Sequence, residues 1–168
     1  SVFAGAVNNL TLNGTGGVTA ISDFTVNGVL NLQSVNPSAV KGSLDMIDGS
    51  TIRTLTMGAE ATTTGPGDVT GIVKRVTINP LVAYTFGNQF TTAYFPDNGT
   101  LPSEISLRIS IGTPPAWRTG AIARETELIQ TGATHLSPTK AVFTIHYLDS
   151  ELNGNEEEHL VFWIQYND

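Results

Sequence analysis

Alternation of apolar and polar residues with a period of two is the feature that most restricts the fold of this chain. It is clearest in two runs, Val142–Leu148 and Leu160–Tyr166, which are rich in β-branched and aromatic residues and flank an acidic loop. Because successive side chains of a strand point to opposite faces of a sheet, this pattern predicts two strands packed in one sheet. The length of 168 residues suits one domain, or one domain with a smaller companion.

Residues 1–78 contain shorter apolar runs, most of them closed by Asn, Asp or Gly. The runs are Leu10–Asn13, Phe24–Gly28, Val29–Leu32, Leu44–Met46 and Leu55–Gly58. Short strands that recur every six to fourteen residues or so predict a parallel β-solenoid or a meander. The alternative is that they are ordinary short strands of a sandwich.

From residue 79 the expected strands become longer and more aromatic. They are Leu81–Phe86, Phe90–Phe95, Ile105–Ile111 and Glu127–Thr131, followed by the two runs described above, with Gly and Pro turns between them. This pattern predicts an antiparallel β-sandwich. Residues 121–129 form the only plausible helix, and a strand or loop fits them equally well. We expect an all-β fold with a short-strand region over 1–78 and a sandwich region over 79–168, or one continuous domain over 1–168.

Charge and composition exclude several classes of function. The net charge is −7 with only eight Lys and Arg residues, so the basic surface that a nucleic-acid-binding protein needs is missing. The Lys74–Arg75 pair is interpreted as part of a solvated strand face. The sequence has no cysteine, which excludes disulfides and thiolate chemistry, and no apolar run approaches the ~20 residues of a membrane-spanning helix. Its first seven residues do not form an intact signal peptide; they suit a mature N-terminus or an internal cut.

No arrangement of residues in the sequence predicts catalysis. The three histidines are scattered, the nucleophile motif Gly-x-Ser-x-Gly is missing, and most closely spaced carboxylates crowd one loop rather than two sides of a cleft. We therefore expect a protein that is not an enzyme.

The acidic loop between residues 148 and 160 resembles a calcium-binding loop. Asp149, Glu151 and Asn153 place oxygen atoms at positions 1, 3 and 5, and Gly154 at position 6 permits the sharp bend. Any of Glu156, Glu157 and Glu158 can supply a further ligand, and Glu156 is the one we assign to this candidate calcium site. The alternative is a solvated acidic turn that binds no metal.

Two aromatic residues are candidates for ligand binding. Trp117 follows two prolines in an expected loop, where an exposed ring can stack on a sugar, and Tyr94 lies in an expected strand. The alternative for Trp117 is packing between sheets. Trp163 lies in an expected strand and is predicted to be part of the core or of an interface.

The order of these motifs resembles that of repetitive β-rich surface proteins and adhesins of Bacteroidetes-type bacteria. The matching motifs are Gly28–Leu32, Gly42–Met46, Thr54–Gly58, Val69–Arg75, Tyr84–Gly87 and the hairpin that starts at Tyr147. The resemblance implies an extracellular or cell-surface location and a structural or adhesive role, without catalytic residues.

We therefore expect a non-catalytic extracellular structural protein, either an adhesin module or a subunit of a filament. Its partners would be copies of itself or other surface proteins. Sheet edges pair readily with added strands, and the apolar N-terminal segment with Val2, Phe3 and Val7 is the candidate donor strand. The alternative is a carbohydrate-binding module whose ligand is a glycan.

Overall fold

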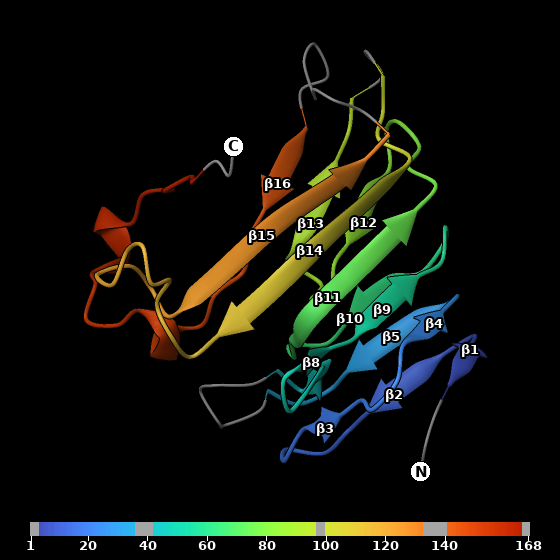
Figure 1. Cartoon of the computed structure of the whole chain (residues 1–168), viewed down its shortest axis with the longest axis horizontal. Coiled ribbons are helices and arrows are strands. Elements are labelled where there is room, and N and C mark those ends of the chain that lie inside the picture. Colours follow the sequence, from blue (N-terminus) through green and yellow to red (C-terminus); the bar gives the residue numbers. More distant parts are fainter. Residues whose placement is uncertain (1–3, 36–41, 97–99, 133–140, 166–168) are drawn as a thin grey trace.

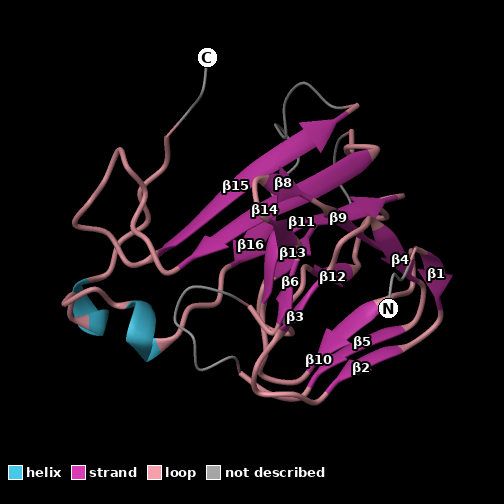
Figure 2. Ribbon diagram, turned by 60° about the horizontal axis from the view of Figure 1, so that its bottom comes forward, coloured by secondary structure: helices cyan, strands magenta, loops and turns pink. Residues whose placement is uncertain are grey.

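The structure is a computed structural model that describes residues 4–35, 42–96, 100–132 and 141–165 (Figure 1). In these residues the chain is built from strands, and the helical parts are the single turns η1 (Asp149–Glu151) and η2 (Glu157–His159) (Figure 2). The predicted all-β fold is confirmed. No helix in the described ranges is long and apolar enough to cross a membrane.

The first part of the chain winds into a parallel β-solenoid. Its turns are formed by β1 (Gly5–Val7), β2 (Leu10–Leu12) and β3 (Val18–Thr19), then β4 (Phe24–Val26), β5 (Val29–Leu32) and β6 (Leu44–Asp45), then β9 (Thr54–Met57), β10 (Thr62–Thr64) and the start of β11 (Val69–Val76). Corresponding strands pair in parallel as β1-β4-β9, β2-β5-β10 and β3-β6-β11. A small hairpin, β7 (Ile47–Asp48) with β8 (Thr51–Ile52), lies between the second and third turns.

Close stacking of the corners explains why the apolar runs end in Asn and Gly. The backbone of Gly28 donates a hydrogen bond to the carbonyl oxygen of Asn8 in the turn before it, at 2.6 Å. A Cβ atom on Gly28 would lie 2.7 Å from that same oxygen, so a larger residue does not fit. The pattern of short closed runs therefore reports solenoid corners rather than a meander.

Strand β11 belongs to two sides of the solenoid at once. Val69 and Thr70 pair with β6, whereas Ile72 to Arg75 pair with β9. The change of partner occurs at Gly71, whose φ is 97° and whose added Cβ would lie 2.6 Å from Cβ of Met46. Only glycine adopts this φ readily, so Gly71 is what allows one strand to turn the corner.

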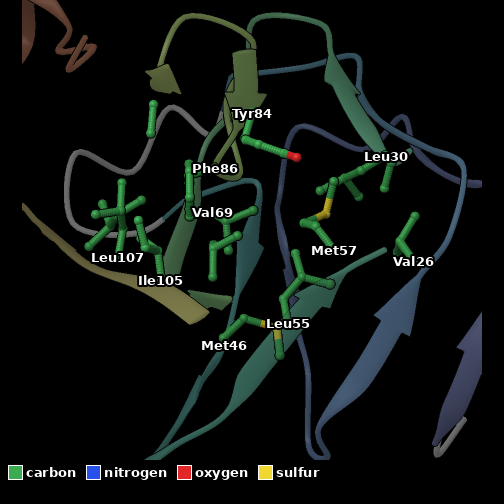
Figure 3. Packing of buried hydrophobic residues seen from close by; sticks show 14 of the residues in the cluster. Val26, Leu30, Met46, Leu55, Met57, Val69, Tyr84, Phe86, Ile105 and Leu107 are labelled. Carbon is green, nitrogen blue, oxygen red and sulfur yellow. The ribbon is translucent and has the colours of Figure 1, made fainter. Parts of the chain in front are cut away.

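The later described strands extend one sheet of the solenoid with antiparallel strands and form a second, antiparallel sheet. Strand β14 (Glu104–Ile111) pairs with β11, and β15 (Arg124–Thr131) pairs with β14. The second sheet contains β12 (Ala83–Thr85), β13 (Thr92–Tyr94) and β16 (Val142–Thr144). The core runs through both regions: one buried cluster includes Leu55 and Met57 of the solenoid as well as Phe86 and Leu107 (Figure 3).

Arg75 corrects the interpretation of Lys74 and Arg75 as a solvated face. Alternation along β11 turns Lys74 outward, where its Nζ lies 3.3 Å from Oε2 of Glu104, and turns Arg75 inward, where it is 0% exposed. The guanidinium of Arg75 donates hydrogen bonds of 2.8 Å to the carbonyl oxygens of Gly58, Ala61 and Thr85. Burial lowers the pKa of Arg75 to about 10, so the side chain remains charged at neutral pH.

Of the alternatives left open for residues 121–129, the structure has loop and strand rather than helix, because β15 starts at Arg124. One prediction about the second half is wrong. The predicted C-terminal strand is not formed over residues 160–165, and Trp163, expected in a core or interface, is 54% exposed. Tyr166 lies outside the described residues.

Candidate functional site

A buried ion-pair cluster joins three distant parts of the chain. Arg124, at the start of β15, lies between Asp68, just before β11, and Glu151, in η1. Nε and Nη2 of Arg124 donate to Oε2 and Oε1 of Glu151 at 2.6 and 2.8 Å. Nη1 and Nη2 donate to Oδ1 and Oδ2 of Asp68 at 3.2 and 3.1 Å. One guanidinium therefore binds two carboxylates in a bidentate manner, and all three side chains are buried.

The charges in this cluster compensate one another only partly. Burial by itself would lower the pKa of Arg124, but its hydrogen bonds with Glu151 and the charges of Asp68 and Glu151 outweigh burial and raise that pKa. Arg124 is therefore a permanent cation that holds the C-terminal loop against the sheet. Since the other two members carry negative charge, the cluster has a formal charge of −1.

The C-terminal loop is attached to the loop between β14 and β15 by two asparagines. Nδ2 of Asn153 donates to the carbonyl oxygens of Ala121 and Thr119 at 2.9 and 3.3 Å. Nδ2 of Asn155 donates to the carbonyl oxygen of Gly120 at 3.1 Å. The loop after β16 thus follows the neighbouring loop instead of forming a tight hairpin.

The structure separates the residues that were predicted to bind calcium. Glu151 faces inward with both carboxylate oxygens bound to Arg124, whereas Asp149 is exposed and Asn153 uses its amide nitrogen on the neighbouring loop. Glu156 lies in an exposed group with Glu158 and His159, and its Oε2 is 2.9 Å from Nδ1 of His159. Exposed acidic groups of this kind are common without a metal. Calcium binding by this loop stays a hypothesis from the sequence, and the hydrogen bonds of Glu151 with Arg124 argue against it.

The candidate ligand-binding aromatic residues lie on different elements. Trp117 is 41% exposed in the loop after β14, and its Nε1 donates to Oε1 of Glu125 at 3.0 Å. Tyr94 is half-buried in β13, which belongs to the sheet of β12, β13 and β16. A second exposed tryptophan, Trp163, contacts the residue that follows Trp117, because the guanidinium carbon of Arg118 lies 3.7 Å from the ring centre of Trp163.

The candidate assembly residues are only partly within the described chain. Val2 and Phe3 lie outside the described residues. Val7 pairs in parallel with Val26 and packs against the core, so it already serves the chain's own solenoid. In the described structure, β1 lies at one edge of the eight-stranded sheet and β15 lies at the opposite edge.

Sequence reasoning missed Asp68 and Arg124 as members of the buried cluster. Asp68 follows a glycine and Arg124 precedes Glu125, and nothing in the spacing of Asp68 and Arg124 relates them to each other or to Glu151. No family model, curated protein or solved structure matches this chain.

Proposed function

We propose that this chain is a non-catalytic structural module of an extracellular or cell surface that associates with copies of itself by strand addition. The observation that carries the proposal is that β1 and β15 are both edge strands of the same sheet in the described structure. An unpaired strand edge offers a row of backbone donors and acceptors to another strand. The extracellular location is supported by the resemblance to bacterial surface proteins.

The first turn of the solenoid supports a head-to-tail contact. Its strands β1 and β2 pair on one side only within the described chain, and Val7, Leu10 and Leu12 are partly buried against the core. An added strand would continue the parallel ladder and cover these side chains. Because this surface differs from that of β15, a contact between the two does not close on itself and builds a fibre. Val2 and Phe3 are the candidate donor residues at this end.

Self-association of the intact chain tests the proposal. Sedimentation at rising protein concentration should show a growing series of oligomers, and negative-stain images should show filaments. Deletion of residues 1–3, which leaves β1 in place, should shorten the series if the N-terminal segment donates a strand. A parent chain that stays monomeric at high concentration would overturn the proposed function.

Carbohydrate binding is a second candidate, favoured by the two exposed tryptophans near Arg118. Their rings have the size and exposure to stack on sugar faces. Retardation of the chain in gels that contain soluble polysaccharides would support this function, provided that Trp117→Ala abolishes it. Equal retardation of the parent chain and of Trp117→Ala would exclude a binding role for Trp117.

A further inference from the structure

The segment Leu160–Gln165 has the composition of a buried strand but lies in solvent. Its large apolar side chains are highly exposed, namely Val161 at 68%, Phe162 at 80%, Trp163 at 54% and Ile164 at 69%. Leu160, Phe162 and Ile164 alternate with Val161, Trp163 and Gln165, so an extended conformation places three apolar side chains on one face. A contiguous group of exposed apolar residues of this kind marks a contact surface.

Strand β15 leaves a matching surface uncovered. Leu128 is directly opposite Leu107 in β14, and Thr126 is opposite Ile109. Because opposite residues share a face of the sheet, Leu128 lies on the face whose members Leu107 and Ile109 are buried. Leu128 is nevertheless 42% exposed, and the outer edge of β15 pairs with no other strand of the described chain. The core is therefore incomplete at this edge.

We propose that residues 160–165 of one copy add as a strand to the outer edge of β15 in a second copy. Leu160, Phe162 and Ile164 then face inward and cover Leu128, while Val161 and Trp163 face outward. The donor segment carries no charge, so it can approach an acidic molecule without ionic repulsion at the contact. This inference rests on the proposed function and identifies a second donor strand for the same kind of assembly.

The donor must come from another copy because contacts in the chain hold its own segment away. The backbone of Gly112 donates to the carbonyl oxygen of Ala123 at 2.7 Å, so the loop with Arg118 extends beyond the end of the β14–β15 hairpin. Arg118 holds Trp163 at 3.7 Å. Leu128 lies four residues into β15, about 13 Å along the strand at about 3.3 Å per residue. Phe162, which precedes Trp163, therefore stays near the loop and does not reach Leu128 of its own chain.

Engineered disulfides test the contact, since the chain has no cysteine of its own. Leu128→Cys and Phe162→Cys are made in separate chains, one of them carrying an affinity tag, then mixed and oxidised. A disulfide-linked heterodimer is expected. Val161→Cys is the matched control, because it is similarly exposed but faces outward in the added strand, and it should give much less product. Equal yields from Val161→Cys and Phe162→Cys, or no heterodimer, would overturn the proposal. So would a doubly substituted chain that forms only an internal disulfide.

A second measurement separates this inference from the proposed function. Phe162→Ser should weaken self-association by roughly 10- to 100-fold, the loss expected for one buried aromatic side chain, whereas Val161→Ser should change it little. If Phe162→Ser associates as tightly as the parent, the inference fails and assembly uses other edges. If the parent itself is monomeric, both the inference and the proposed function fail.

Discussion

The carboxylate of Glu151 meets the guanidinium of Arg124 edge to edge, with Nε–Oε2 and Nη2–Oε1 distances of 2.6 and 2.8 Å. Glu151→Gln removes the negative charge and one of the two acceptor oxygens. The buried guanidinium of Arg124 then lacks one of its hydrogen-bond acceptors and one of its two counter-charges. We expect a loss of about 3 kcal/mol in the free energy of unfolding, as for other broken buried pairs. Urea denaturation measures it. Asp149→Asn, in the same turn but exposed, should change stability by no more than about 0.5 kcal/mol. Equal effects of the two substitutions would show that the pair does not stabilise the fold.

Calcium should leave the melting temperature unchanged. Glu151 is the central ligand of the loop predicted from the sequence, and Arg124 already occupies both of its oxygens. Melting curves recorded with calcium and with a chelator should coincide for the parent and for Asp149→Ala. A calcium-dependent rise that Asp149→Ala removes would contradict this prediction and restore the loop as a metal site.

Arg75 should tolerate neither Met nor Lys. Met leaves the carbonyl oxygens of Gly58, Ala61 and Thr85 without their donor, and each unsatisfied buried group costs about 1–3 kcal/mol. Lys keeps the charge but lacks the planar fork that reaches all three oxygens. Thermal unfolding should show a large drop for Arg75→Met and a smaller one for Arg75→Lys. A Met variant as stable as the parent would mean that apolar packing replaces these hydrogen bonds.

The pKa of Arg75 predicts the sign of a pH effect. Burial lowers this pKa in the folded protein to about 10, well below its ordinary value, so the folded state binds its proton less tightly than the unfolded state does. The penalty for burying the charge is fully present at neutral pH and declines as pH rises above about 10. Measured against Arg75→Met, the parent should therefore gain relative stability above that pH. A constant difference between the two proteins would contradict the lowered pKa.

Gly71→Ala should disturb the corner of β11. The methyl group would contact Met46, and the backbone angle of 97° disfavours any residue with a Cβ atom. The expected loss in unfolding free energy is about 2 kcal/mol or more. Gly16→Ala is the matched control, because an added Cβ there meets nothing within 4 Å. Similar stabilities of the two variants in urea would show that the corner adapts to alanine.

Periodicity in the sequence was sufficient to predict an all-β fold, because strand patterning follows from local rules, whereas for residues 1–78 it left a solenoid, a meander and a sandwich as alternatives. Runs that end in Asn and Gly, such as Phe24–Gly28, reflect corners that stack too closely for a Cβ atom. Alternation also carried information that the prediction did not use. Adjacent residues of a strand face opposite ways, so one member of the Lys74–Arg75 pair had to point toward the core.

Features that depend on partners distant in sequence were not predictable. The oxygen spacing in residues 149–153 is suitable for a cation. Arg124, which is distant in sequence at the start of β15, instead binds both carboxylate oxygens of Glu151. In the same way, the alternation of residues 160–165 fits a strand, yet pairing requires a neighbouring edge within reach. The structure places this segment beside a loop, where Arg118 contacts Trp163, and residues 160–165 pair with no strand of the described chain.

Because β11 pairs with two sides of the solenoid, we expect it to complete the stack late in folding. Strands β6 and β9 gain their parallel partner on the C-terminal side only when residues 69–76 take their place, and the bend at Gly71 lets one strand pair with both. Contacts between residues distant in sequence form slowly, because the chain between them must first be closed into a loop. We therefore expect a chain that emerges N-terminus first to become fully rigid only after residue 76 has been made.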